Sequence, residues 1–375
     1  MSVGLYLHVP FCRTRCHFCA FTLQIHREDR VRRYLDSLSR EIRLHANQQS
    51  LAVRRLDTVY FGGGTPTTLQ PTQLTGILQQ VRGSFGLNDG AEISVEAHPD
   101  TVTEEGLRHL VRAGVTRISF GAQSMDIEEL LQIGRRTSGD RTRAAVRMAR
   151  EAGVASVNLD LIYGVPGQPL DGWLESLDQV LALEPDHVSC YALTVEEKTR
   201  LHLDVRRGDA AEPDAALQNE MEDAAAGRLA ATGFTRYEIS NYARPGHACR
   251  HNLLYWQGHD YLGLGPSAQS YLDGRRFGNV EDVARYDLAL EQGRLPIAES
   301  EILSADQRGR ERIVFGLRLI EGVDQALLRH APPDGAWRQT LDRLTRRGWL
   351  EERAGRLRLT DEGRRFADSV AVELI

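Results

Sequence analysis

Three cysteines near the amino terminus have the type and spacing of a metal-binding site. Cys12, Cys16 and Cys19 form a CxxxCxxC pattern directly after a short apolar run at residues 5–9. If that run is a strand, the three thiols lie on a loop at its carboxyl end. Soft thiolates at this spacing suit a zinc ion or an iron–sulfur cluster.

The number of thiols favours a cluster over zinc. A structural zinc site closes with four protein ligands, and this loop lacks a fourth thiol, because Phe21 follows Ala20. Three thiolates can hold a [4Fe–4S] cluster and leave one iron open for an exogenous ligand. The other cysteines, Cys190 and Cys249, lie far away in the sequence, and a reducing cytosol would keep all five thiols free.

Further candidate ligand groups follow later apolar runs of the chain. The segment GGGT at 62–65 lacks Cβ atoms at its glycines, so backbone groups there can approach a ligand closely. Glu96 offers a carboxylate as a hydrogen-bond acceptor, and Arg135 can pair with a carboxylate in bidentate fashion. Asp160 and Ile162 share one face of a strand, because strand side chains alternate. They would give one carboxylate and one apolar surface on the same side of the sheet.

An alternation of strands and helices in the first half of the chain is expected to position these groups. Apolar, β-branched runs alternate with windows in which apolar residues recur three and four apart, as at Val31, Tyr34, Leu38 and Ile42. Consecutive units of this kind indicate a parallel α/β sheet that forms a barrel or partial barrel. The six predicted strands cover residues 5–9, 58–61, 92–96, 117–120, 156–162 and 187–193.

The second half of the chain predicts two further units. Beyond Thr194, a polar helical stretch at about 213–231 leads into an extended segment and a loop rich in glycine, histidine and aromatic residues up to Tyr271. From about residue 304 onward, two helices, a hairpin and a last helix resemble a winged helix. The expected organisation is a partial (β/α)6 barrel at 1–200, an α+β extension at 201–300 and a small winged-helix-like domain at 301–375.

Composition and charge limit the expected partners and location. The chain has 375 residues, a net charge of −6 and 26% charged residues, and Lys198 is its only lysine. Without a basic domain, nucleic acid is not an expected partner, even of the winged-helix-like part. No run of about 18 apolar residues and no amino-terminal signal pattern occurs. We therefore expect a cytoplasmic protein with no transmembrane segment, and a peripheral membrane contact stays open.

The cysteine loop and its flanks resemble the radical S-adenosylmethionine superfamily. The resemblance rests on YLHVPF at 6–11, the CxxxCxFC loop and the motifs that follow the later strands. Within the superfamily the chain is similar to the group of oxygen-independent coproporphyrinogen III oxidase. The resemblance implies a [4Fe–4S] cluster on the three cysteines, S-adenosylmethionine on the open iron, and a flavodoxin- or ferredoxin-type reductant. It places at the cofactor Tyr6, Phe18, Gly63, Gly64, Thr65, Glu96, Gln123, Arg135, Asp160 and Ile162.

A second motif, HNLLYW at 251–256, resembles the HNxxYW motif that separates heme chaperones from the decarboxylases of this group. In the heme chaperones the histidine is associated with heme binding. The resemblance therefore implies that His251 binds heme, which the protein would transfer to an acceptor protein. Two other interpretations stay open: His251 could cap a turn while the aromatic residues fill a seam between domains, or His247, Cys249 and His251 could form a small metal site.

Departures from the patterns of the group keep a second class of function open. Phe21 stands where the decarboxylases have a further cysteine, which disfavours coproporphyrinogen oxidation. Ala20 departs from the CDF sequence that is common in the heme chaperones, and Gln269 stands where a histidine is common. The alternative is a radical S-adenosylmethionine enzyme of the same group, a methyltransferase or cyclopropanase that acts on a small aromatic metabolite or a peptide.

Overall fold

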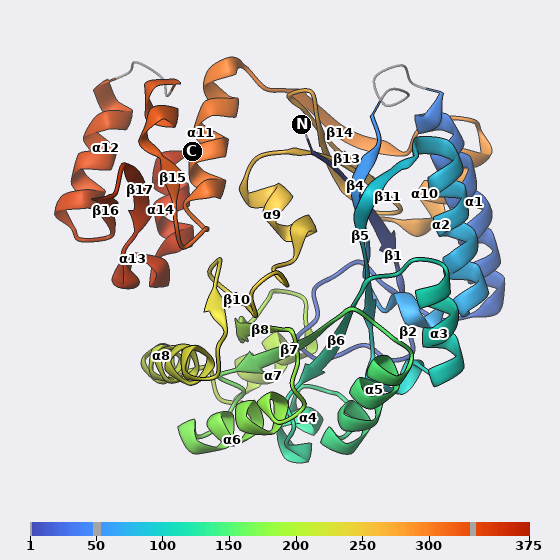
Figure 1. Ribbon diagram of the computed structural model, residues 1–375, viewed down its shortest axis with the longest axis horizontal. Helices are drawn as coiled ribbons and strands as arrows, with labels where there is room; N and C mark the ends of the chain where they lie inside the picture. The colour runs from blue at the N-terminus through green and yellow to red at the C-terminus, as the bar shows by residue number, and fades with distance from the viewer. Residues whose placement is uncertain (1, 48–53, 331–334) are drawn as a thin grey trace.

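A curved sheet forms the centre of the protein in the computed structural model, which describes residues 2–47, 54–330 and 335–375 (Figure 1). The sheet has twelve strands, and the middle of it is parallel. In sheet order the parallel strands are β11 (Asp260–Leu264), β1 (Val3–Val9), β4 (Leu56–Gly63), β5 (Leu87–Ala97), β6 (Arg117–Gln123), β7 (Ser156–Tyr163) and β8 (His187–Ala192).

All six strands predicted from the first half of the chain lie in this sheet, and the predicted α/β class is confirmed. The barrel does not close, because β1 pairs with β11 and not with β8. Antiparallel strands extend both sides of the sheet. They are β10 (Asn241–Ala243) and β9 (Thr235–Arg236) beyond β8, and β12 (Gln269–Leu272), β13 (Arg275–Asn279) and β14 (Ile297–Ile302) beyond β11.

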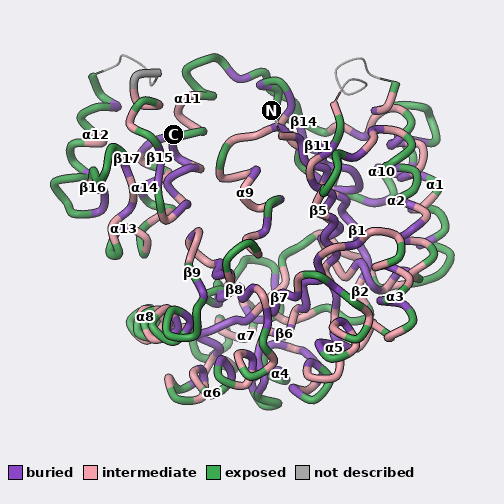
Figure 2. The backbone as a smooth tube through the Cα atoms, viewed as in Figure 1, coloured by how far each residue is buried: buried purple, intermediate pink, exposed green. Residues whose placement is uncertain are grey.

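Helices cover the outer face of the sheet, and their apolar stripes are buried against it (Figures 1 and 2). In α1 (Glu28–Ala46) the predicted stripe from Val31 to Ile42 is fully buried, as the three-and-four spacing requires. The other helices of this layer are α2 (Pro71–Phe85), α3 (Glu104–Arg112), α5 (Gly139–Glu151), α6 (Leu170–Leu181), α8 (Ala215–Ala231) and α10 (Val283–Glu291). The short helix α4 (Ile127–Gln132) follows β6.

One helix lies on the concave side of the sheet. Helix α9 (Arg250–Trp256) contacts β1, β4 and β11 and lies near the centre of the view in Figure 1. The sequence indicated only a loop here, because a helix of seven residues shows too little periodicity to be recognised. Strand β11, which follows it, was also missed, although it extends the parallel sheet beside β1.

The carboxyl-terminal unit has a hydrophobic core of its own, which includes Ile313, Leu344, Trp349 and Leu357. Its two helices and hairpin follow the predicted order, and the short strand β15 adds a third strand to the hairpin. The elements are α11 (Ala305–Gly316), β15 (Val323–Asp324), η3 (Gln325–His330), α12 (Gly335–Arg346), β16 (Leu350–Arg353), β17 (Arg356–Leu359), α13 (Asp361–Arg365) and α14 (Ala367–Leu374). In the described part of the chain, none of the helices combines the length and the apolar character needed to cross a membrane.

Candidate functional site

The cysteine loop leaves the carboxyl end of β1 and is anchored on both sides. Two short parallel strands, β2 (Phe11–Cys12) and β3 (Gln24–Ile25), hold its ends together. In its middle, the amide of His17 donates to the carbonyl of Ile133, and the amide of Leu201 in α7 (Arg200–Arg207) donates to the carbonyl of His17. The loop is therefore fixed against two neighbouring segments, and its three cysteines are half-exposed free thiols.

The electrostatic environment of these thiols calls for a compensating positive charge. Burial raises the pKa of Cys12 to about 11, and burial also raises the pKa of Cys16. The guanidinium of Arg135 acts against both shifts, whereas the charge of Cys19 adds to both. Bound iron would supply the missing charge, since metal binding requires and stabilises the thiolate form.

The described side chains do not form a site for a single metal ion. Among residues 2–47, 54–330 and 335–375, no three His, Cys, Asp or Glu side chains converge closely enough to share one metal ion. In a [4Fe–4S] cluster each thiolate binds a different iron, so the thiols are held further apart than around one ion. The cluster on Cys12, Cys16 and Cys19 therefore stays a prediction from the sequence.

The glycine segment at the end of β4 packs directly on the start of the cysteine loop. Gly63 has a φ of 106°, and a Cβ atom on it would lie 2.6 Å from the ring of His8. A Cβ atom on Gly64 would lie 2.7 Å from the carbonyl oxygen of Phe11, so glycine is required at both positions. This close approach brings Thr65 Oγ1 to 3.4 Å from Cys12 Sγ.

Two carboxyl groups face the inside of the barrel near the strand ends. Glu96 accepts hydrogen bonds from the Tyr60 hydroxyl (2.9 Å) and the Gly63 amide (3.2 Å). Asp160 accepts from Ser119 Oγ (3.0 Å) and Asn158 Nδ2 (2.7 Å). Burial and then the charge of Asp160 raise the pKa of Glu96 to about 7, and burial raises the pKa of Asp160. Since a carboxylate offers about four lone-pair sites, both groups can accept further hydrogen bonds from a ligand.

Arg135 supplies a buried cation next to the cysteines. Its residue exposure is only 6%, and within the described residues its Nε has no hydrogen-bond partner. Its charge interacts with Cys16, Cys12 and Asp160, in that order of strength. A buried donor without a partner is rare in native proteins, so this guanidinium fits an anionic ligand group such as a carboxylate. Gln123, at the end of β6, adopts a φ of 67° beside it, a left-handed conformation unusual outside glycine.

An apolar wall completes this end of the barrel. Ile162 is buried in a small cluster, separate from the main core, against which Phe18 packs. Leu159 and Leu161 belong to the main core instead, so Asp160 and Ile162 share the inner face, as the alternation predicts. Tyr6 lies further inside, where its hydroxyl is 3.2 Å from His8 Nδ1. The predicted cofactor residues thus gather from the ends of successive strands, and their donors, acceptors and apolar surface fit S-adenosylmethionine.

His251 lies elsewhere, on α9 near the amino-terminal ends of the strands. It is 1% exposed, and both of its ring nitrogens are engaged: Nδ1 with Thr58 Oγ1 (2.7 Å) and Nε2 with the Tyr255 hydroxyl (2.8 Å). Its ring also stacks on Tyr60, with centroids 5.1 Å apart. Burial lowers the pKa of His251 to about 3, so the imidazole is neutral. Neutral imidazole is the form that binds iron, but a ring nitrogen becomes available only when one hydroxyl moves away.

The start of α9 is held by an acidic residue from β5. The carboxylate of Glu92 accepts hydrogen bonds from the first two amides of α9, both at 3.1 Å, and lies 3.6 Å from Cys249 Sγ. The side chain of His247 approaches Asp186 instead, at 4.0 Å. The structure therefore directs His247, Cys249 and His251 toward different partners and does not bring them together as a metal site.

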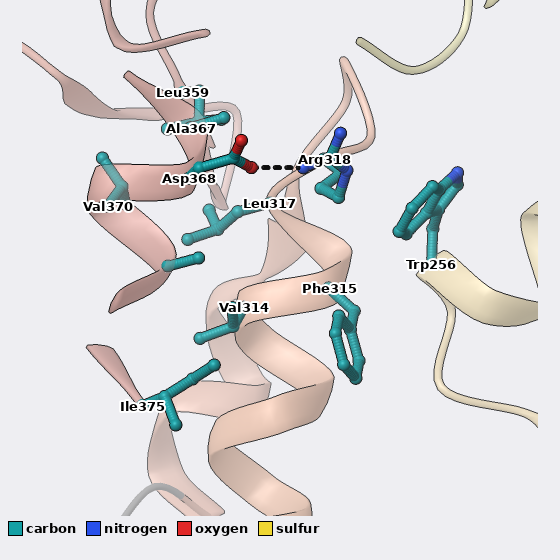
Figure 3. A pocket seen from close by; sticks show the side chains of 11 residues that line it. Trp256, Val314, Phe315, Leu317, Arg318, Leu359, Ala367, Asp368, Val370 and Ile375 are labelled. Atoms are coloured by element: carbon teal, nitrogen blue, oxygen red, sulfur yellow. Dashed lines mark hydrogen bonds and ion pairs between the residues drawn. The ribbon is translucent and has the colours of Figure 1, made fainter. Parts of the chain in front are cut away.

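The last residue of α9 faces the carboxyl-terminal unit across a small pocket (Figure 3). The pocket has a volume of about 200 Å³ and is mostly apolar, with Trp256, Phe315 and Val370 in its wall. Arg318 lies 4.9 Å from the centre of the Trp256 ring and hydrogen-bonds Asp368 at 3.0 Å. The aromatic residue of the motif thus lies at the seam between α9 and the last unit, one of the placements that the sequence left open.

Sequence reasoning missed the residues that surround His251. Thr58, Tyr60 and Gly62 occupy every second position of β4 and therefore share its inner face. The strand pattern could have shown that they face the barrel interior. Glu92 could not have been found in this way, because nothing in the local sequence connects it to a helix that follows more than 150 residues later.

Known proteins resemble the chain along its whole length. The family model of the radical SAM superfamily matches residues 6–180, and that of the HemN C-terminal domain matches residues 303–366. The protein named "Heme chaperone HemW" of Mycobacterium tuberculosis is 40% identical over 99% of this chain and 94% of its own length. The protein of the same name from Bacillus subtilis is 32% identical over 97% of both chains.

A solved structure supports the fold. Coproporphyrinogen III oxidase (HemN) from Escherichia coli matches 100% of this chain and 90% of its own, with a TM-score of 0.86. Its sequence identity is 24%, so this likeness concerns the fold.

Proposed function

The chain belongs to the HemW family of the radical S-adenosylmethionine superfamily, and we propose from this premise that it is a heme chaperone, which binds heme and transfers it to an acceptor protein. The observation that carries the proposal is the 40% identity to a heme chaperone over 99% of the chain. Membership of the superfamily also implies a [4Fe–4S] cluster and S-adenosylmethionine.

We assign the cluster to Cys12, Cys16 and Cys19. When bound, the cluster supplies the electron for reductive chemistry at the sulfonium of S-adenosylmethionine. The protein's own residues would bind and orient that cofactor. Arg135 would pair with its carboxylate, because this guanidinium is buried and its Nε has no partner among the described residues.

The nucleoside half of the cofactor would lie between the two carboxylates and the apolar wall. Glu96 and Asp160 would accept hydrogen bonds from ribose hydroxyls, and Ile162 with Phe18 would cover the adenine. The close packing of the glycine segment allows the methionyl part to approach the backbone at Gly63, Gly64 and Thr65, with Tyr6 and Gln123 beside it.

His251 would supply a ring nitrogen to the heme iron. Because the Tyr255 hydroxyl and the Thr58 hydroxyl engage both nitrogens, one of these hydrogen bonds must break when heme binds. Heme binding would therefore include a local rearrangement around α9. We further propose a flavodoxin- or ferredoxin-type electron donor and a cytoplasmic location.

Heme uptake by the reconstituted protein tests this function. We expect anaerobically reconstituted protein to bind about one heme per chain with a Soret band, and His251→Gln to lose or shift that band. Glutamine is similar in length to histidine and keeps one donor and one acceptor at its end, so the variant should fold. His247→Gln is the matched control, since the His247 side chain is directed toward Asp186, and it should retain the wild-type spectrum.

A second arm separates the chaperone from an enzyme. Coproporphyrinogen III, offered with reductant and S-adenosylmethionine, should remain unconverted. Its conversion at enzymatic rates, or a wild-type heme spectrum in the His251→Gln protein, would contradict the proposal.

A further inference from the structure

We propose that Tyr60 is a positioning residue that couples the two sites, so that heme on His251 weakens the binding of S-adenosylmethionine. The inference rests on the proposed function and adds to it a connection between the two ligands. It depends on the side chain of Tyr60, which contacts both sites.

Tyr60 lies between the heme motif and the cofactor pocket. Its hydroxyl donates to Glu96 Oε1 at 2.9 Å, and its ring stacks on His251 with centroids 5.1 Å apart and planes at 23°. The ring of Tyr6 also stacks on the ring of Tyr60, with centroids 6.2 Å apart. The hydroxyl of Tyr60 thus contacts the nucleoside pocket while its ring contacts the heme motif.

The ring of Tyr60 is tightly packed, so it must shift when His251 moves. A Cβ atom on Gly62 would lie 3.0 Å from the Tyr60 ring and 2.9 Å from the Tyr6 ring, so both rings press against the backbone of β4. Iron ligation requires His251 to break a hydrogen bond and to turn. Because protein interiors are close-packed, a turn of that ring displaces the ring stacked on it.

Displacement of Tyr60 changes Glu96 directly. Burial disfavours the ionised form of Glu96, and the hydrogen bond from Tyr60 acts in the opposite direction, so losing it raises the pKa of Glu96 further. The other oxygen of Glu96 accepts from the amide of Gly63, which lies in the glycine segment of the cofactor pocket. A protonated or rotated Glu96 is a poorer acceptor for ribose hydroxyls, and the affinity for S-adenosylmethionine therefore falls.

The coupling is reciprocal by thermodynamic necessity. If heme lowers the affinity for S-adenosylmethionine by some factor, then S-adenosylmethionine lowers the affinity for heme by the same factor. Binding of S-adenosylmethionine would thus promote heme release, which is the step that a chaperone must complete at its acceptor.

A second chain of hydrogen bonds offers an alternative route between the sites. Asn158 donates to Asp160 and contacts His187 Nδ1 at 2.6 Å, and His187 Nε2 lies 2.8 Å from the Tyr237 hydroxyl. That hydroxyl accepts from the amide of Cys249, just before α9. The experiment must therefore distinguish Tyr60 from this route.

The test is the dissociation constant of S-adenosylmethionine for the reconstituted protein, with and without one equivalent of heme, in wild type and variants. In wild type we expect heme to raise this constant by about tenfold, within the usual range of coupling between sites. In Tyr60→Phe, which keeps the ring and removes the hydroxyl, the ratio should fall to about one. Tyr286→Phe is the matched control, because the Tyr286 hydroxyl also donates to a buried carboxylate, that of Glu41 at 2.6 Å.

The Tyr286→Phe protein should keep the wild-type ratio. If Tyr60→Phe does not assemble its cluster, Tyr60→Met replaces it, since methionine fills irregular space and also lacks the hydroxyl. A ratio near one in wild type with both ligands bound would overturn the inference and leave the chaperone function intact. Coupling that survives in Tyr60→Phe but is lost in Tyr237→Phe would overturn it in favour of the second route. Failure of wild type to bind heme would overturn the function and the inference together.

Discussion

The two ends of the barrel differ in how far their polar groups are already satisfied. At the carboxyl ends of the strands, the cysteines are half-exposed free thiols, and Arg135 Nε is buried without a partner among the described residues. At the amino-terminal ends, His251 has hydrogen bonds at both ring nitrogens, and Glu92 holds the first amides of α9. The first end is arranged to receive a ligand, whereas the second is complete as it stands.

This difference indicates two kinds of binding. A ligand at the carboxyl end meets groups that are already in place, so little reorganisation opposes it. Heme at α9 must first displace a hydroxyl from His251. The apparent affinity for heme is therefore the intrinsic affinity multiplied by the fraction of molecules in which this hydroxyl has moved away. Weakened retention suits a protein that has to release heme again.

Loss of a single cysteine should have the largest effect. Cys12→Ala, Cys16→Ala and Cys19→Ala should each abolish the cluster, measured as iron content and as the electron paramagnetic resonance signal after dithionite reduction. Cys190→Ala is the control: that thiol is fully buried in β8, and burial raises its pKa to about 12. A full cluster in any of the three variants, or stoichiometric zinc in place of iron, would contradict the assignment of the cluster.

Truncation at the satisfied end should reduce stability. His251→Ala leaves two buried hydroxyls without their partner and removes the ring stacked on Tyr60. We expect the free energy of unfolding, from urea denaturation of the cluster-free protein, to fall by about 2–4 kcal/mol. His247→Ala, at a half-exposed position, should change it by less than about 0.5 kcal/mol. Equal losses of unfolding free energy in the two variants would contradict the view that the polar groups around His251 are already satisfied.

Substitution at the receptive end should affect binding more than stability. Asp160→Asn should weaken the binding of S-adenosylmethionine by about 1–3 kcal/mol, because a charged acceptor for a ribose hydroxyl is lost. Burial raises the pKa of Asp160 in the folded state, so the ionised wild-type carboxylate destabilises the folded protein. This cost is absent below the pKa of Asp160 in the unfolded chain and grows as the pH rises through its pKa in the folded state. Removal of the charge should therefore offset part of the stability that the variant loses with one of its two acceptor oxygens at pH 8. Unchanged affinity with lowered stability would mean that Asp160 is a structural group.

The smallest expected effect is a pH dependence of cofactor binding. Because burial and the charge of Asp160 raise the pKa of Glu96 to about 7, the carboxylate is mostly protonated at pH 6 and mostly ionised at pH 8. The affinity for S-adenosylmethionine should rise by up to about tenfold over this interval, as expected for one ionisation. Glu96→Gln should remove the part of this dependence that Glu96 causes. The same pH profile in wild type and in Glu96→Gln would show that another group titrates.

The sequence predicted the parts of the fold that depend on local pattern. The six predicted strands and the α1 stripe from Val31 to Ile42 are present in the structure. They could be predicted because the spacing of apolar residues along the chain depends on which face each strand or helix buries. The spacing of the cysteines and the alternation of Asp160 and Ile162 likewise needed no knowledge of distant residues.

The surroundings of α9 could not be predicted in the same way. This helix is short, its first amides bind Glu92 from a distant strand, and His251 is held by Thr58 across the barrel. Such contacts depend on tertiary placement, so the sequence identified the motif but not its burial. For the same reason, the role of Tyr60 between the two sites became visible only in the structure.

The most direct test of the account is a pair of titrations in two variants, each of which disables one end of the barrel. In the cluster-free Cys16→Ala protein, heme should still bind with the wild-type Soret band, since His251 lies at the other end. In reconstituted His251→Gln, S-adenosylmethionine should still change the resonance signal of the reduced cluster, while heme binding is lost or altered. Loss of heme binding together with the cluster, or loss of the S-adenosylmethionine response in His251→Gln, would contradict the assignment of the two ligands to two ends.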